Sequence, residues 1–417
     1  MDRLNAMRRT LLTLAIDTAA QSGLDAVSLR HIAKQAGCST AVIFQNFEGK
    51  ADLLQAALDQ AIKLDAGFHR SLLADVSGLI TGHIAFADFL SAYVELRAVT
   101  RHARFLSEML VTRNDSDSSQ AALRQWHQDR TAFWHEVLAP FAFADRLAPI
   151  VAEYALMEEI YAYSMIGQPR FHLLMREAAR ALTDACFNDG MASGAISGIN
   201  AEVGGQVRAA RGKPDPQGPS MPEQMLGHAI QLIKEHGIGG LNQRMLARKA
   251  GVSSSMISYH FKDMKSFTNQ AVWRALVEEI PSEFDPQGGA VQFPNSVGEW
   301  LNFLNSMLAV EPGKGSVGFY VSFSRMAGEA SLLARSDKSL VPLMVYLREI
   351  DGWGTYRLSR NIPAMADRVQ RQHAAAFAVW IKAEAILRYS GLVDPADGRS
   401  RLDEAIAIIF PLADEHS

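Results

Sequence analysis

Two short segments of the sequence place small polar side chains at the start of an expected helix. Small groups at a helix N-terminus allow the helix to enter the major groove of DNA, and glutamine can pair with adenine through two hydrogen bonds. The pattern therefore predicts base reading, with solvent exposure alone as the alternative. The candidate residues are Thr40, Ala41 and Gln45 in the first segment and Ser254, Ser255 and Tyr259 in the second.

A second set of polar and basic side chains flanks these segments. Such groups bind phosphate oxygens, which position a protein on DNA without reading its sequence. Ser28 and Asn242 also stand where helix N-caps are expected, and capping and phosphate binding can coexist. The set comprises Ser28, Arg30, Asn46, Lys50, Asn242, Arg244, Ser258, His260 and Lys262.

The elements that must position these side chains occur twice, at a constant offset of 214 residues. Each copy predicts two short helices joined by a turn at Gly37 or Gly251, where glycine provides a positive φ, and Ser39 is expected to cap the third helix. This is the layout of a helix-turn-helix. The offset aligns, without a gap, Gly23 with Gly237, Arg30 with Arg244, Ala33 with Ala247, Ala36 with Ala250, Gly37 with Gly251, Ser39 with Ser253, Ile43 with Ile257 and Phe47 with Phe261.

The remainder of the chain has helical spacing of apolar residues and no strand-like alternation, which predicts an all-α fold. In the second half, for example, we expect single helices over residues 338–360 and 364–391. Glycine and proline are dense over residues 191–222, which indicates an exposed linker. The predicted parts are a first DNA head (1–49), a first helical body (50–195), a linker (196–222), a second DNA head (223–263) and a second helical body (264–417).

Charge is unevenly distributed in this chain of 417 residues, whose net charge is −4. Residues 1–50 contain six lysines and arginines against four carboxylates, and residues 221–270 contain six against three. Local basic regions on an acidic body are typical of localised phosphate contact. The sequence therefore remains compatible with nucleic-acid binding despite its acidic total.

Other function classes find little support in the sequence. No metal-ligand cluster, phosphate-binding glycine motif or GxSxG pattern appears, so we predict no catalysis, cofactor or metal. No apolar run reaches the roughly 18 residues that would cross a membrane, and Asp17 interrupts the apolar stretch near the N-terminus, which disfavours a signal peptide. Two cysteines without disulfide spacing agree with a cytoplasmic location, and Cys38 is expected to be a small buried hydrophobe rather than a redox switch.

Both copies contain an aliphatic residue followed by alanine, an Ala-Gly pair, a serine, a second aliphatic residue and a phenylalanine at the same spacing. This pattern resembles the TetR family of bacterial transcription regulators. The matching residues are Ile32, Ala33, Ala36, Gly37, Ser39, Ile43, Phe44, Phe47, Lys50 and Leu53 in the first copy, and Leu246, Ala247, Ala250, Gly251, Val252, Ser253, Ile257, Tyr259, His260 and Phe261 in the second.

The resemblance implies a three-helix DNA head on a helical body that binds a small molecule and dimerises through its last two helices. Ordinary members are single units, whereas this chain resembles two fused units. The four-helix bundle would then form between residues 145–190 and 368–413, which gives an intramolecular pseudodimer. The resemblance adds Ser39, Phe44, Ser253 and Lys265 to the predicted DNA contacts.

The second copy departs from the pattern at two positions. Ser258 stands where the first copy has Phe44, and Met264 stands where the first copy has Lys50. A family lysine at the second of these positions contacts phosphate, and in the second copy the nearest lysine is Lys265, one place later. The two heads are therefore expected to differ in their surface chemistry.

Aromatic and methionine side chains in the bodies could line a pocket for an apolar or aromatic effector, although most must form ordinary core. The candidates are Tyr93, Trp126, Phe133, Met157, Tyr161, Phe319, Phe323, Trp353 and Trp380. We predict a ligand-responsive repressor that binds a double-stranded operator of asymmetric or imperfectly palindromic sequence, as a single chain or after further self-association. The alternative is a regulator in which one half has lost DNA binding and serves as a sensing or protein-interaction module.

Overall fold

The computed structural model describes residues 2–112, 116–187, 199–200, 202, 220–278, 280, 294–310, 317–394, 397–410 and 412. Within these ranges the regular elements are helices, and the only β-type pairing is an isolated bridge between Val310 and Val317. The predicted all-α fold is therefore confirmed. Most of the predicted linker, residues 196–222, lies outside the described ranges.

Along the chain, the helices of the second half are arranged in the same general order as those of the first half. The first half contains α1 (Asp2–Ser22), η1 (Leu24–Ala26), α2 (Leu29–Gln35), α3 (Thr40–Phe44), α4 (Lys50–Val76), α5 (His83–Val99), α6 (Arg101–Val111), α7 (Asp117–Leu138), α8 (Ala144–Met165) and α9 (Pro169–Phe187). The second half contains α11 (Met221–His236), α12 (Gln243–Ala250), α13 (Ser254–Phe261), α14 (Met264–Glu278), α15 (Val297–Met307), α16 (Phe319–Ala334), η3 (Lys338–Leu340), α17 (Val341–Ile350), α18 (Trp353–Ser359), α19 (Arg371–Tyr389) and α20 (Gly398–Ile409).

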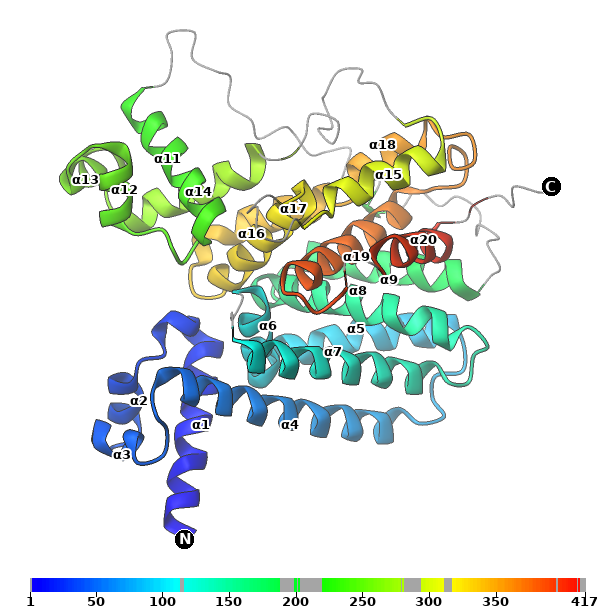
Figure 1. The fold of residues 1–417 in the computed structure, drawn as a ribbon. Coiled ribbons are helices and arrows are strands. Elements are labelled where there is room, and N and C mark those ends of the chain that lie inside the picture. Colours follow the sequence, from blue (N-terminus) through cyan, green and yellow to red (C-terminus); the bar gives the residue numbers. More distant parts are fainter. Residues whose placement is uncertain are drawn as a thin grey trace.

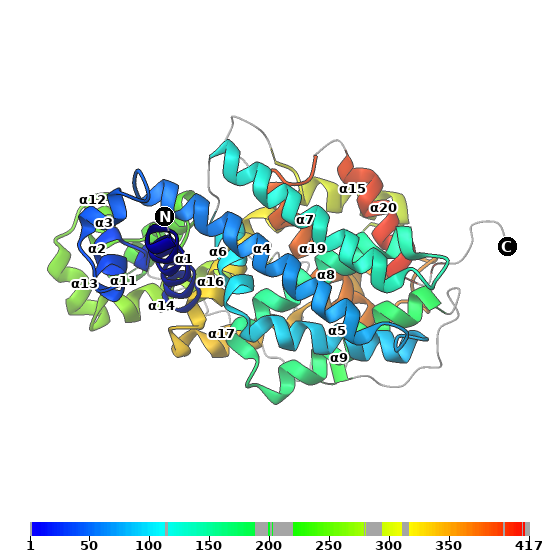
Figure 2. The same cartoon turned by 90° about the horizontal axis from the view of Figure 1, so that it is seen from below.

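Two small groups of helices project from the same end of a larger helical body (Figure 1). We call α1–α3 the first head and α11–α13 the second head. The view from below again places α3 and α13 at that end of the molecule (Figure 2). Helix α4 runs from the first head along the body, and α14 connects the second head to it.

Helix α8 lies at the centre of the body and is buried along almost its whole length. Helices α5, α7 and α9 of the first half pack on it, and so do α16, α17 and α19 of the second half. Helix α19 is similarly buried and also contacts α9, while α20 packs on α9 and α19. Helices α8, α9, α19 and α20 thus form a bundle that joins the two halves within one chain.

A buried ion pair and a buried hydrogen bond cross the interface between the halves. The Arg348 guanidinium donates to Glu158 of α8 at 2.8 Å, and Lys382 of α19 donates to the Tyr161 hydroxyl at 2.7 Å. Burial raises the pKa of Glu158, and the Arg348 charge opposes that rise. Removing one partner of a buried pair typically costs about 3–5 kcal/mol, so the halves are strongly held together.

Two helices that the sequence predicts in the second body are interrupted. The segment 338–360 is divided into η3, α17 and α18, and Gly352 separates α17 from α18 with a left-handed backbone of φ 73°. The predicted helix 364–391 begins only at Arg371, after an N-cap at Gln370, and ends at Tyr389. A side chain at Gly352 would lie 2.2 Å from the backbone of Ala374, so the break permits a close approach between α18 and α19.

Replacing Gly352 by alanine should destabilise the protein, because the new Cβ meets backbone and the left-handed conformation is strained for an L-residue. We expect a loss of more than about 2 kcal/mol, measured by urea unfolding. Gly227→Ala is the matched control: Gly227 lies within α11 with nothing within 4 Å of the added Cβ, so alanine should be neutral or slightly stabilising. Equal effects of the two substitutions would contradict this explanation.

The buried His373 should make stability depend on pH. Burial lowers its pKa from 6.5 to about 4, so the folded protein excludes a proton that the unfolded chain binds. The associated stability is fully present above pH 6.5 and is lost as the pH falls towards 4. Between pH 7 and pH 5, the free energy of unfolding of the native chain should fall by about 2 kcal/mol more than that of the His373→Gln variant. Urea unfolding at both pH values measures this difference.

The exposed His31 provides the control for this measurement, because its side chain stays in water in both states. His31→Gln should follow the native pH dependence. If His373→Gln does so as well, His373 is not the group responsible.

Candidate nucleic-acid interface

The first helix-turn-helix is formed by α2 and α3 as predicted. Ser28 caps α2, since its Oγ accepts a hydrogen bond from the His31 amide at 3.2 Å. Gly37 makes the turn with φ of 66°. Ser39 occupies the N-cap position of α3 with an extended backbone, but its side chain makes no capping hydrogen bond, contrary to our expectation.

The second helix-turn-helix repeats this geometry with different side chains. Asn242 caps α12 by accepting a hydrogen bond from the Met245 amide at 3.0 Å, and Gly251 makes the turn with φ of 65°. Ser253 precedes α13 without a side-chain capping bond, and its hydroxyl lies 2.8 Å from that of Ser255. Two equivalent scaffolds therefore present two different recognition helices, α3 and α13.

The predicted base-reading side chains lie on the exposed faces of these helices. Thr40, Ala41 and Gln45 are exposed on α3, where Phe44 is 59% exposed. On α13, Ser255 and Ser258 are exposed and Tyr259 is 80% exposed, so a large ring is available beside the polar groups. The side chain of Ser254 lies outside the described part of the chain.

The other faces of these helices are packed in the core of each head, so they are not available for contact with DNA. Ile43 and Phe47 are buried in the core, and Val42 is half-buried. Ile257 and Phe261 are buried in the same way in the second head. Cys38 packs against the hydrophobic core but is only half-buried, whereas we expected it to be buried.

The predicted phosphate-binding residues are placed around the recognition helices. Arg30, Arg244 and Lys262 are exposed, whereas Asn46 and His260 are half-buried. Lys50 is exposed and donates to the Leu24 carbonyl at 3.3 Å, and Lys265 is exposed and pairs with Asp337 at 3.3 Å. Their DNA contacts remain predictions.

Arg8 is a positioning residue that the sequence prediction missed. Its guanidinium lies over the Phe47 ring, 4.4 Å from the centroid, and donates to the Asn46 carbonyl. These contacts fix the end of the recognition segment against α1. The equivalent position in the second head is Pro222, so only the first head has this contact. Nothing in the spacing of the sequence signals a pair formed across 38 residues.

The predicted effector-binding residues all lie in the interior of the two bodies. None of the nine lines either of two cavities that are described below. Their role in effector binding therefore stays a prediction. Tyr93, Trp126, Phe133, Met157, Tyr161, Phe323 and Trp380 are buried, and Phe319 and Trp353 are half-buried.

A buried polar network surrounds two of these residues in the first body. The Trp126 indole donates to Asp65 at 2.8 Å, and Arg130 donates to the Tyr93 hydroxyl at 3.0 Å. Burial alone would raise the pKa of Asp65, but the charge of Arg97, together with smaller contributions from His102, His69 and Arg130, holds that pKa well below its usual range. The polar groups of Trp126 and Tyr93 are thus already engaged within the protein.

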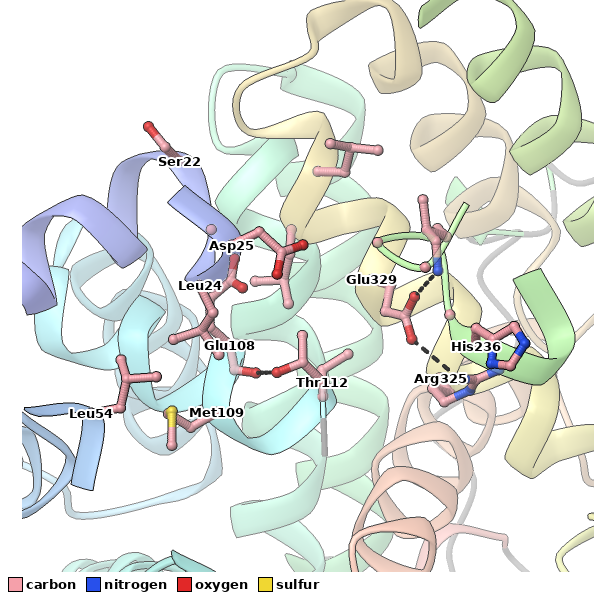
Figure 3. Close-up of a pocket in the computed structure, with 18 of the residues that line it drawn as sticks. Ser22, Leu24, Asp25, Leu54, Glu108, Met109, Thr112, His236, Arg325 and Glu329 are labelled. Atoms are coloured by element: carbon pink, nitrogen blue, oxygen red, sulfur yellow. Dashed lines mark hydrogen bonds and ion pairs between the residues drawn. The ribbon is translucent and has the colours of Figure 1, made fainter. Parts of the chain in front are cut away.

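The larger of the two cavities, of about 1430 Å³, lies between the heads and the body. Its lining includes Leu24 and Asp25 from the first head, Ile238 from the second head, and Glu108 and Glu329 from the body. The close-up shows Leu24, Asp25 and Glu108 on one side of this space and Glu329 on the other (Figure 3). The smaller cavity, of about 310 Å³, lies between α7 and the segment that precedes α20.

Two heads with exposed recognition helices on one helical body define a helix-turn-helix DNA-binding protein. The family model described as bacterial regulatory proteins, tetR family, matches residues 11–57 and again residues 226–270. The chain therefore contains two tandem DNA-binding units of the tetR type, which supports a transcriptional regulator with one such unit in each half. A search of curated proteins matched no relative.

Two further findings concern the described residues only. None of their helices combines the length and apolar character that crossing a membrane requires. Their histidine, cysteine and acidic side chains form no group of three or more that could hold a metal ion.

Replacing Arg8 by alanine should loosen the first recognition segment, because the ring contact and the hydrogen bond to Asn46 are lost. We expect a local loss of about 1 kcal/mol, seen as faster amide hydrogen exchange in residues 40–47. Residues 254–261 serve as the internal control and should exchange at the native rate. Equal acceleration in both heads would show that Arg8 acts on global stability instead.

Proposed function

We propose that the chain is a ligand-responsive repressor that binds one asymmetric or imperfectly palindromic operator through both heads. The observation that carries this proposal is the pair of unlike recognition helices, α3 and α13, at the same end of one chain. Two copies of a helix-turn-helix usually read two half-sites in successive major grooves, about 34–36 Å apart. Because the two helices present different side chains, their half-sites should differ in sequence.

The buried interface between the halves supports a single-chain pseudodimer. Arg348 and Glu158 belong to different halves and pair in the interior, so the two heads are joined through the body as well as through the chain. A tandem chain of this kind needs no second copy to bring two heads to DNA. We propose the cytoplasm as its place of action, since that is where a bacterial operator is found.

The proposed effector is small and largely apolar, in keeping with the aromatic interior of the two bodies. Binding there would change the packing of α4 on α6 and α7, or of α14 on α16. Since α4 and α14 lead directly from the heads, such a change would alter the relative placement of the recognition helices. This mechanism requires no catalytic chemistry.

A second candidate function is favoured by the surface of the second head. Met264 is half-buried at the position of the exposed Lys50, and Ser258 replaces the exposed Phe44. A head with a weaker phosphate contact could serve as a sensing or interaction module. The exposed basic residues Arg244 and Lys262 favour retained DNA binding instead.

Selection of random double-stranded DNA with the full chain, followed by footprinting of the enriched sequence, tests the proposal. We expect two protected half-sites of unlike sequence bound by one chain. A strict palindrome bound by two chains, each through one head, would contradict the single-chain pseudodimer. Protection of only one half-site would favour the second candidate function.

Substitutions on the first head should separate base reading from phosphate binding. Gln45→Ala should reduce discrimination at one base pair by about 1–3 kcal/mol. Arg30→Ala should weaken binding evenly across sequences. It should also reduce the slope of log affinity against log salt concentration by the amount that about one phosphate contact contributes. Binding of both variants to the enriched operator and to its point variants, over a range of salt concentrations, measures these effects. A changed sequence preference in Arg30→Ala would assign Arg30 to base reading.

A further inference from the structure

The body holds the two heads through equivalent positions of the repeat. The 214-residue offset relates Ala19 to Ile233 and Leu24 to Ile238, which lie at and just beyond the end of the first helix of each head. At both places a carboxylate of the body accepts a backbone amide proton, and an arginine of the body donates to backbone carbonyls. We call each glutamate and arginine pair a head clamp.

The first head clamp consists of Glu108 and Arg335. Glu108 of α6 accepts a hydrogen bond from the Leu24 amide. Arg335 donates to the Ala19 carbonyl at 3.2 Å and to Glu108 at 2.7 Å, with both side chains buried. Arg335 follows α16, so a residue of the second half holds the head of the first half.

The second head clamp consists of Glu329 and Arg325, both on α16. Glu329 accepts a hydrogen bond from the Ile238 amide and lies 3.5 Å from Arg325. Arg325 donates to the carbonyls of Ile233 at 3.1 Å and of Lys234 at 2.7 Å. Figure 3 shows Glu329 between Arg325 and the amide of the second head, with Glu108 across the cavity.

The two heads are placed by their contacts with the body, since a cavity lies between the clamps. The helices of the two heads form no substantial helix–helix contact among the described residues, and a space of about 1430 Å³ separates much of the facing surfaces. Asp25 of the first head does approach Gly239 of the second, which is its equivalent under the offset. The described helices of the heads instead pack on the body, α1 on α4 and α6 and α11 on α14 and α16, and the clamps add buried charged contacts at these junctions.

We infer that Glu108, Arg335, Glu329 and Arg325 are positioning residues that set the separation of the two recognition helices and thereby the half-site spacing that the chain selects. Because both arginines belong to α16 and its C-cap, one helix holds both heads at a fixed separation. The inference rests on the proposed two-headed DNA binding. It adds to that proposal the residues that determine spacing.

The experiment uses the full chain and a library of its selected half-sites separated by spacers of varied length. The native chain should prefer one spacing. Arg335→Met keeps the length of the side chain and removes its donors. The preferred spacing should therefore shift by about one base pair or more, or the ratio of affinities between the preferred spacing and the others should fall about tenfold. The preferred bases within each half-site should not change. Arg399→Met is the control, because Arg399 is half-buried on α20, pairs with Asp403 of the same helix and donates to Asn302, far from both clamps.

A distance measurement without DNA separates this inference from the proposed function. Spin labels at the equivalent exposed positions Lys34→Cys and Arg248→Cys, in a chain with Cys38 and Cys186 replaced by serine, report the head separation by electron paramagnetic resonance. The distance distribution should broaden or shift in Arg335→Met and stay native in Arg399→Met. If Arg335→Met does not fold, Glu108→Gln provides the same test, since its amide oxygen can still accept the Leu24 proton while the ion pair is lost.

Each outcome decides the inference. Changes in both spacing preference and head separation support it. An unchanged spacing profile and distance distribution, even with lower overall affinity, overturn it and leave the proposed function intact. If the native chain selects no DNA, both the proposed function and the inferred role in DNA spacing fail. The distance measurement then reports only whether the clamps place the heads.

Discussion

Three carboxylates of α8 must be paired in the interior, and their partners determine how the chain is assembled. Glu159 pairs with Arg97 and Arg130 of the first half, whereas its neighbour Glu158 pairs with Arg348 of the second half. Glu153, one turn and a half earlier, meets Arg401 of α20. Consecutive residues of a helix point in directions about 100° apart, so one helix can satisfy both halves at once. An unpaired charge in this position would be strongly destabilising.

This constraint has a direct consequence at the heads. Because α8, α16 and α19 pack together, the two halves share one body, and both heads are attached to it. Helix α16 touches both halves and also provides the arginines that hold the heads. A tandem chain therefore replaces the symmetric interface of two identical subunits with an interface whose two sides can differ. That freedom is visible in the heads, where Gln45 and Tyr259 occupy equivalent positions.

The parts of the fold that were predictable from sequence are those set by local interactions. Ser28 and Asn242 cap helices through amides three residues later, and Gly37 and Gly251 make turns that only glycine adopts readily. The residues on the open faces of α3 and α13 could also be assigned, because helical spacing separates them from Ile43 and Ile257. By contrast, the break at Gly352 depends on the approach of Ala374, and helical spacing alone gave one continuous helix there.

The sequence by itself determined that the protein has two helix-turn-helix heads with unlike surfaces, because a motif and its repeat are encoded in residues close together in the chain. Only the tertiary structure decided which charges meet, since Arg335 reaches Glu108 across 227 residues and Arg8 reaches Asn46 across 38. Such pairs have no periodicity that spacing could reveal. Their geometry follows from how α6, α8 and α16 pack, and packing is a property of the whole folded chain.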